Sequence, residues 1–119
     1  MQIRLEQIAW ARSGDKGPNS NVGVLFRHEA LYRWALEILS VERVGAHLAR
    51  IARGGVIRYE LDNLRALNFI LKDSLGGGGS ESLLNDAQGK THGQALLQLE
   101  LELPEALAHL VDTLPAEDL

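Results

Sequence analysis

Residues 56–72 read Val-Ile-Arg-Tyr-Glu-Leu-Asp-Asn-Leu-Arg-Ala-Leu-Asn-Phe-Ile-Leu-Lys, and this stretch decides the fold. Apolar and polar residues alternate on both sides of a short polar turn, which is typical of two antiparallel strands. In the second strand, Leu67, Phe69 and Leu71 share one face, because successive side chains of a strand point to opposite faces. We therefore predict a β-hairpin whose inward face carries these three side chains, with Asn68 on the opposite face.

Helices are expected before this hairpin. Apolar residues recur at helical spacing over 31–38 and again over 41–52, and Ser40 between the two runs is an expected N-cap. Gly54 and Gly55 end the second run, since glycine is common just after the last turn of a helix. The sequence predicts two short helices, or one helix kinked at Ser40.

A first strand is expected over residues 3–11, but its alternation changes phase. Ile3 and Leu5 share one parity, whereas Ile8 and Trp10 have the other. A β-bulge between the two pairs adds one residue and returns both to the same face. We therefore predict a single bulged strand at the amino-terminal end.

The carboxyl-terminal part is expected to add a helix, a strand and a closing helix. A helix over 88–97 contains Gly89 and Gly93, each of which costs about 1 kcal/mol relative to alanine but permits close backbone approach. Leucines alternate with polar residues over 97–103, which predicts a half-buried strand. The closing helix, 104–112, begins with a proline, as the first turn of a helix allows.

The predicted fold class is α+β, in a single domain of residues 1–119. Apart from the first strand, the order of elements is βαββαβ, the split or ferredoxin-like arrangement. We expect the helices to pack on one face of the sheet, with an extra N-terminal strand and a short C-terminal helix.

Composition excludes several classes of protein. The formal net charge is −4 and the basic residues are scattered, whereas nucleic-acid binders usually carry a basic face, and an anionic membrane surface also attracts basic segments. There is no cysteine, which excludes disulfides, thiolate metal sites and a cysteine nucleophile. The amino-terminal residues lack the apolar region of a signal peptide. We expect a cytoplasmic protein that binds neither nucleic acid nor membranes.

Residues 12–21 read Arg-Ser-Gly-Asp-Lys-Gly-Pro-Asn-Ser-Asn and are expected to form a polar loop before a strand at 21–27. Glycine frees backbone N–H groups for an anion-binding nest, and Lys16 adds a positive charge for a phosphate or carboxylate. The alternative is a wide hairpin turn, in which Asp15 and Asn21 cap local backbone groups.

Four consecutive glycines, residues 76–79, follow the predicted hairpin. Because each glycine loses much conformational entropy on folding, the run predicts a backbone that approaches a ligand closely, and the alternative is a surface loop without function. We expect residues 13–21 and 75–90 to converge on one surface site that binds an anionic group. The candidate ligand-binding residues are Ser13, Asp15, Lys16, Asn19, Asn21, Asn68, Gly76, Gly77, Gly78, Gly79, Ser82, Gln88 and Lys90.

The four histidines show no metal-ligand spacing. Asp15 and Asp86 carry carboxylates that can coordinate a hard cation, but neither shows the pattern of a calcium loop, so no metal site is predicted. His28, His47 and His109 are expected to be solvated. His92 alone is near the candidate site, without an orienting carboxylate at an obvious spacing.

Several motifs occur in one order along the chain. They are Ala-Arg-Ser-Gly-Asp-Lys-Gly at 11–17 with Asn-Val-Gly-Val at 21–24, Ala-Leu-Asn-Phe at 66–69, Leu-Gly-Gly-Gly-Gly at 75–79 with Ser-Leu at 82–83, and Asp-Ala-Gln-Gly-Lys at 86–90. Together they resemble the acyclic terpene utilisation (AtuA) family, and in particular its small C-terminal ferredoxin-fold domain, over about residues 7–104.

The resemblance implies a link to the bacterial breakdown of branched or isoprenoid acids through acyl-CoA intermediates. Longer members carry a large N-terminal domain, so a separate large subunit of this type is an expected partner. We expect a ligand-binding or accessory domain that forms a homo-oligomer, with a CoA thioester as one ligand and no cofactor; the sequence leaves open whether the chain catalyses a reaction by itself. One alternative is an interaction module that uses 97–103 as an edge strand; another is a small isomerase or hydrolase that uses Asp15 and His92.

Overall fold

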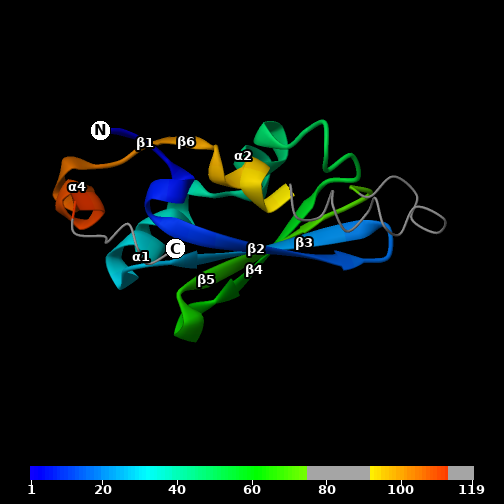
Figure 1. The fold of residues 1–119 in the computed structure, drawn as a ribbon, viewed down its shortest axis with the longest axis horizontal. Coiled ribbons are helices and arrows are strands. Elements are labelled where there is room, and N and C mark those ends of the chain that lie inside the picture. The colour runs from blue at the N-terminus through cyan, green and yellow to red at the C-terminus, as the bar shows by residue number, and fades with distance from the viewer. Residues whose placement is uncertain (75–91, 113–119) are drawn as a thin grey trace.

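The computed structural model describes residues 1–74 and 92–112. The chain forms two antiparallel sheets with helices beside them (Figure 1). In chain order the elements are β1 (Gln2–Arg4), η1 (Leu5–Gln7), β2 (Ala9–Lys16), β3 (Asn19–Phe26), α1 (Glu29–Ile38), α2 (Val41–His47), β4 (Val56–Leu61), η2 (Asp62–Leu64), β5 (Ala66–Leu71), the helical segment 92–97, β6 (Glu100–Glu102) and α4 (Glu105–Asp112).

Four strands form the larger antiparallel sheet in the order β2-β3-β5-β4. β5 lies between β3 and β4, and α1 and α2 connect these two strands, which is the split βαβ arrangement. The α+β class and the ferredoxin-like arrangement are therefore confirmed, as is the hairpin of β4 and β5. β2 is the extra N-terminal strand, and it pairs with β3 along its full length.

The last strand lies outside this sheet. β6 pairs with β1 in a separate two-stranded sheet, because β2 already occupies the free side of β3. The strand predicted over 97–103 is accordingly short, and Leu97 belongs to the helical segment 92–97. Its alternation is confirmed, since Leu99, Leu101 and Leu103 are buried. β1 pairs with one side of β6, so one side of the edge strand predicted over 97–103 is already occupied.

The predicted β-bulge in the first strand is wrong. η1 separates β1 from β2, and the N–H of Ile8 closes it by donating to the carbonyl oxygen of Leu5 at 3.0 Å. A bulge keeps a strand within its own sheet, whereas this turn moves the chain from one sheet to the other. Consequently Ala9 is buried in the core. Trp10 lies on the opposite face, where the guanidinium of Arg27 stacks on its ring at 4.3 Å.

The polar stretch 13–21 is not the predicted loop but part of a hairpin, which was the alternative, although its turn is narrow rather than wide. Residues 13–16 complete β2 and residues 19–21 begin β3, so that only Gly17 and Pro18 connect the strands. Gly17 has φ of +63°, a backbone region that glycine enters without steric cost. The turn-forming tendency of the other polar residues is overridden by continuous pairing between β2 and β3.

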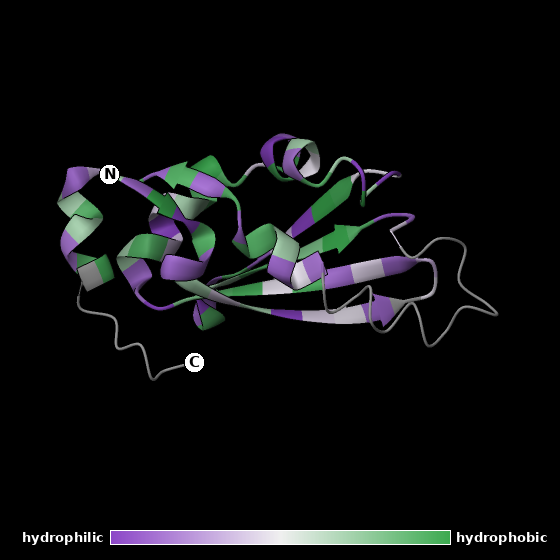
Figure 2. Cartoon of the chain, turned by 45° about the horizontal axis from the view of Figure 1, so that its top comes forward, coloured by the Kyte–Doolittle hydropathy of each residue, from purple (hydrophilic) through white to green (hydrophobic). Residues whose placement is uncertain are grey.

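α1, α2 and the segment 92–97 pack on the buried face of the larger sheet (Figure 1). Ser40 caps α2 as predicted, because its Oγ accepts a hydrogen bond from the N–H of Arg43 at 3.1 Å. α2 ends at His47, earlier than predicted, although Leu48 and Ala52 remain buried in the turns that follow. In Figure 2 the β2–β3 hairpin changes from hydrophobic near the helices to mostly hydrophilic toward its tip. The core therefore ends before the tip of the hairpin.

Candidate functional site

Ser20 occupies a core position of β3. Burial alternates along this strand, and Ser20 shares the buried face with three apolar residues. It is fully buried, so its polar groups require partners inside the protein. Ser20 Oγ lies 2.7 Å from Ser74 Oγ and 3.0 Å from Nδ1 of His92, and the N–H of Ser20 donates to Ser74 Oγ at 2.9 Å. Three residues distant in sequence thus form one buried polar cluster.

These hydrogen bonds fix the protons in the Ser20–Ser74–His92 cluster. The hydroxyl of Ser74 donates to the carbonyl oxygen of Leu71 at 2.7 Å, so Ser74 Oγ can only accept from Ser20. The hydroxyl hydrogen of Ser20 is therefore directed to Ser74. His92 must then carry its hydrogen on Nδ1 and donate it to Ser20 Oγ, because Ser20 has no second hydrogen to give. In the neutral ring, Nε2 is the proton acceptor.

The cluster does not activate Ser20 as a nucleophile. Activation requires the imidazole to accept the hydroxyl hydrogen, and here the hydrogen bond runs in the opposite direction. Burial lowers the pKa of His92 from its ordinary value, because the apolar surroundings disfavour the imidazolium. The cluster instead holds together Ser74 and His92, the described residues that flank positions 75–91, at one point on β3.

Asp15 is brought to the same region by the register of the hairpin. Asp15 and Ser20 are directly paired between β2 and β3, so their side chains are neighbours on the helix-covered face. A carboxylate therefore lies beside the residue that binds His92, although the two are far apart in sequence. The number of residues between Asp15 and His92 gave no indication that Asp15 lies beside the residue that binds His92.

Two more predicted residues contact the segments that flank positions 75–91. A β-carbon at Gly93 would lie 2.4 Å from Oγ of Ser13, so the close approach predicted for Gly93 is confirmed. Asn19 Oδ1 accepts a hydrogen bond from the N–H of Asp73 at 2.9 Å. The side chain of Lys16, and the whole of Gly76, Gly77, Gly78, Gly79, Ser82, Gln88 and Lys90, lie outside the described part of the structure.

Asn21 and Asn68 lie on the other face of the sheet. Nδ2 of Asn21 donates to Oδ1 of Asn68 at 3.1 Å, so the two amides pair across β3 and β5. Gly14 leaves room for them, since a β-carbon there would lie 2.9 Å from Oδ1 of Asn21. Strand alternation therefore separates this amide pair from Ser13 and Asp15, and the two sets do not share one side of the sheet.

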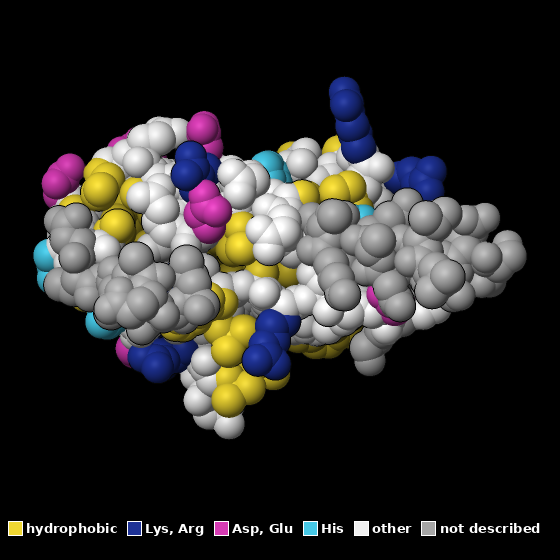
Figure 3. All heavy atoms as spheres, in the orientation of Figure 1, with side chains coloured by type: hydrophobic (Ala, Val, Ile, Leu, Met, Phe, Trp, Pro, Cys, Tyr) yellow, Lys and Arg dark blue, Asp and Glu magenta, His cyan; other side chains and the backbone are white. Residues whose placement is uncertain are grey.

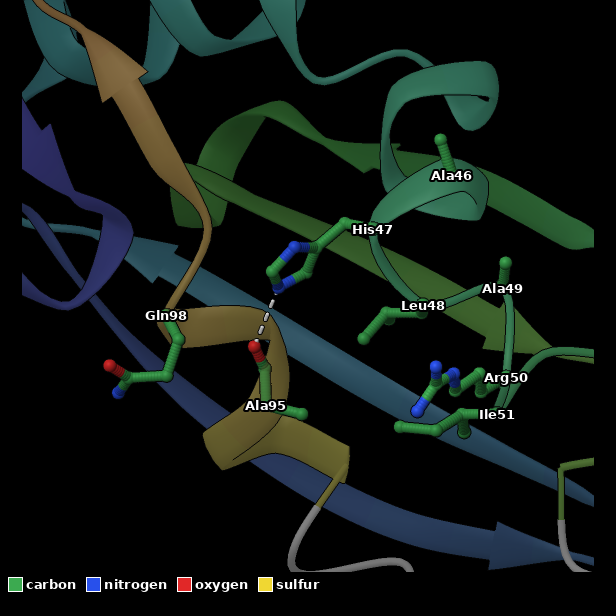
Figure 4. A pocket seen from close by; sticks show the side chains of 8 residues that line it. All are labelled: Ala46, His47, Leu48, Ala49, Arg50, Ile51, Ala95 and Gln98. Atoms are coloured by element: carbon green, nitrogen blue, oxygen red, sulfur yellow. Dashed lines mark hydrogen bonds between the residues drawn. The ribbon is translucent and has the colours of Figure 1, made fainter.

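A groove lies between α2 and the segment 92–97, on the helix-covered face (Figure 4). Its volume is about 580 Å³, within the range of small-molecule sites. In Figure 4 the side chain of Leu48 and the methyl group of Ala95 point into the space between the two elements. The groove is lined by Ala46, His47, Leu48, Ala49, Arg50, Ile51, Ala95 and Gln98.

His47 lies at one end of this groove; it is exposed, as predicted, and it also makes a hydrogen bond that the sequence did not predict. Its Nε2 lies 2.8 Å from the carbonyl oxygen of Ala95, so Nε2 carries the hydrogen and donates it. Arg50 extends toward the groove from the turn that follows α2, on the same wall as His47 (Figure 4). None of the ion pairs within residues 1–74 and 92–112 includes Arg50. The groove therefore combines alkyl walls with one exposed cation.

The surface shows no continuous basic area on the face seen in Figure 3, where lysine and arginine side chains form separate patches. Within the described residues, no group of three or more histidine, aspartate or glutamate side chains could hold a metal ion. In that same part of the chain, no helix combines the length and the apolar character that crossing a membrane requires.

Sequence reasoning missed the groove and the buried serines. The burial of Ser20 could have been predicted, because Ser20 lies on the same face of its strand as Val22, Val24 and Phe26. No pattern in the sequence indicated the groove, since its two walls come from distant segments. The model of the AtuA ferredoxin-like domain matches residues 3–102 of the chain. Searches of curated proteins and of solved structures found no match.

Proposed function

Because the chain belongs to the AtuA ferredoxin-like domain family, we propose that it is a binding domain for an anionic acyl compound such as an acyl-CoA thioester. The groove between α2 and the segment 92–97 carries this proposal. It offers about 580 Å³ between largely alkyl walls, with the guanidinium of Arg50 beside them. A ligand that suits it has an aliphatic chain and a negative charge.

The alkyl chain is the part of the ligand that the groove suits best. Each methylene group that leaves water for an apolar surface contributes about 0.8 kcal/mol. Leu48, Ile51 and Ala95 supply such a surface. A chain of a few carbon atoms in this groove would therefore add measurably to the affinity of a charged head group.

The anionic head group is assigned to the helix-covered side of the β2–β3 hairpin. The Ser20–Ser74–His92 cluster supports this assignment, because it fastens both flanks of positions 75–91 to that side. The sequence of 75–91 includes five glycines and a lysine, which supply backbone N–H groups and a positive charge. On that side the residues assigned to the head group are Ser13 and Asp15. Lys16 and Asn19, which are paired next to the Gly17–Pro18 turn and share the strand parity of Asn21, are assigned to it from the end of the hairpin. The remaining residues assigned to the head group are Gly76, Gly77, Gly78, Gly79, Ser82, Gln88 and Lys90.

We assign no reaction to this chain. In the described residues the buried Ser20 directs its hydroxyl hydrogen to Ser74, and this argues against a serine–histidine hydrolase. In this proposal the domain acts in the cytoplasm and presents its ligand to a separate large subunit of the AtuA type. That subunit would carry the chemistry of branched or isoprenoid acid breakdown.

Thermal unfolding in the presence of octanoyl-CoA, CoA and octanoate tests the assignment of the groove. A ligand that binds only the folded state raises the midpoint temperature. Octanoyl-CoA is expected to stabilise the protein more than either fragment. Ala95→Phe, which fills the groove, should remove the advantage of octanoyl-CoA over CoA, whereas Ala30→Phe, at an exposed position of α1, should preserve it.

Charge variants test the head-group assignment. Lys16→Ala should weaken stabilisation by both CoA and octanoyl-CoA, whereas Lys72→Ala, an exposed lysine after β5, should not. Arg50→Gln should weaken binding of octanoate, with the exposed Arg53→Gln as its control. Equal midpoints with and without octanoyl-CoA, at concentrations up to the millimolar range, would overturn the proposal.

A further inference from the structure

Within residues 1–74 and 92–112, β2 forms one outer edge of the larger sheet, because β3 is its one paired neighbour there. The direction of its backbone groups follows from one hydrogen bond, in which the N–H of Arg27 donates to the carbonyl oxygen of Ile8 at 3.3 Å. Since backbone groups alternate in direction along an antiparallel strand, Ala9, Ala11 and Ser13 direct theirs away from β3. Among the described residues, no backbone hydrogen bond from another segment reaches Ala9 or Ala11.

A cavity lies beside this edge. A space of about 440 Å³ lies beside residues 9–11 of β2, and Gln94 and Leu97 of the segment 92–97 form its other side. Unpaired strand edges pair readily with another strand, and proteins usually protect them with charged or bulky side chains. β4, at the opposite edge, has such protection in the ion pair of Arg58 and Glu60 at 2.6 Å. Beside the cavity β2 places the small residues Ala9 and Ala11 together with Trp10, and Arg12 follows on the same face as Trp10.

We propose that β2 pairs antiparallel with β2 of a second copy of this chain, about a twofold axis at Ala11. In this register Ala11 of the two copies lie opposite each other, and Ala9 lies opposite Ser13 of the second copy. Arg12 then lies opposite Trp10 of the second copy, and the same contact occurs twice by symmetry. A guanidinium over an indole is a favourable pair, and Trp10 already binds Arg27 in this way.

Two registers with the axis nearer the tip of the hairpin fit less well. An axis at Arg12 places the two Arg12 side chains directly opposite each other, and like charges in that position are destabilising. An axis at Ser13 moves the pairing toward Gly93, which already contacts Ser13 closely, and away from the cavity beside residues 9–11. The axis at Ala11 uses the open stretch of the edge and the complementary Trp10 and Arg12. This dimer does not depend on the ligand proposed above.

Light scattering during size-exclusion chromatography of the full chain tests the proposal over a range of concentrations. The wild-type protein is expected at twice its chain mass of 13.1 kDa. Ala11→Pro removes an N–H that β3 does not use, so the fold should survive while the dimer dissociation constant rises by at least about tenfold, the effect of losing about two backbone hydrogen bonds. Glu60→Pro is the matched control. The N–H of Lys72 donates to the carbonyl oxygen of Gly55, so Gly55 faces β5. Because backbone groups alternate in direction along the strand, the N–H of Glu60 points away from β5.

Arg12→Glu is the second variant, in case Ala11→Pro unfolds. It leaves the backbone intact and replaces the cation over Trp10 by an anion, so it should also weaken the dimer by about tenfold or more. A wild-type protein that remains monomeric at all concentrations overturns the proposal. A dimer that Arg12→Glu leaves unchanged overturns it as well, since another surface must then hold the copies together.

Discussion

The Nδ1–H of His92 donates a hydrogen bond to Oγ of Ser20 across 3.0 Å, and 72 positions of sequence separate the two residues. Through Ser74, the same hydroxyl is joined to the end of β5. The contact fixes the start of the segment 92–97 on β3, and this segment forms one wall of the groove proposed for the acyl chain. The polar cluster is therefore the structural base on which the proposed binding site depends.

His92 should make stability depend on pH below neutrality. Its pKa is lowered in the folded protein, whereas in the unfolded chain it lies near 6.5. The contribution of His92 to stability is thus present above about pH 6.5 and is lost as the pH falls through the lower folded value. Urea unfolding at about pH 7.5 and about pH 5.5 should show a smaller loss for His92→Gln than for the wild type. His109→Gln, at an exposed position, should keep the wild-type loss; equal losses in all three proteins would contradict this prediction.

Ser74→Ala should destabilise the protein by about 1–3 kcal/mol, because it leaves the N–H and the hydroxyl hydrogen of Ser20 buried without an acceptor. Ser20→Ala removes one of these donors together with its hydroxyl oxygen. The double variant should therefore lose less than the sum of the two single losses. Chemical denaturation of the four proteins measures this coupling, and strictly additive losses would show that the hydroxyls do not interact.

Gly93→Ala should destabilise the protein by about 1–3 kcal/mol, the usual cost of overpacking, although alanine is the better helix former. The reason is the distance of 2.4 Å between the added β-carbon and Oγ of Ser13. Ser13→Ala removes that oxygen, so the double variant should recover most of the loss. Thermal unfolding of the single and double variants measures the recovery. If the double variant is no more stable than Gly93→Ala alone, the two residues are not in contact.

Tyr32 should ionise only in strongly alkaline solution. Burial in the core raises its pKa to about 12, and its hydroxyl also donates to Oδ1 of Asp62 at 2.5 Å. In Tyr59→Phe, Tyr32 is the remaining one of the two tyrosines, so phenolate absorbance reports it alone. The absorbance should rise near pH 12.

The same titration shows what raises the pKa of Tyr32. Asp62→Asn in the Tyr59→Phe background should lower the apparent pKa while leaving it above the ordinary value, since burial is the larger cause. Because the folded pKa is the higher one, the stabilisation by Tyr32 is complete below about pH 10 and declines as the pH rises toward 12. An apparent pKa near 10 in the folded Tyr59→Phe protein would contradict the burial of this hydroxyl.

Where neighbours in sequence dominate, prediction from the sequence succeeded. The β4–β5 hairpin was predicted from alternation around a polar turn, and the face carrying Leu67, Phe69 and Leu71 is the buried one. The Ser40 cap was predicted for the same reason, because its hydroxyl accepts from an N–H only three residues away. The close approach of Gly93 was also expected from a glycine inside a helix, although its partner Ser13 was not.

Prediction failed where two segments compete for one partner. Polar, glycine-rich residues favour turns locally, yet residues 13–16 and 19–21 pair as strands because β2 and β3 bond along their whole length. β6 was expected beside the main sheet, and it pairs with β1 because β2 occupies that place. Neither outcome can be derived from one segment considered alone.

The spacing of apolar residues along the chain was enough to establish the α+β class, the split βαβ order and most of the buried residues. This spacing shows which side chains share one face of a strand or helix, and that is a local property of the backbone. The tertiary structure decided which sheet received each strand, how Ser20, Ser74 and His92 share their protons, and where α2 and the segment 92–97 leave a groove. These features depend on contacts between residues far apart in sequence, whose geometry is set only when all the elements have packed together.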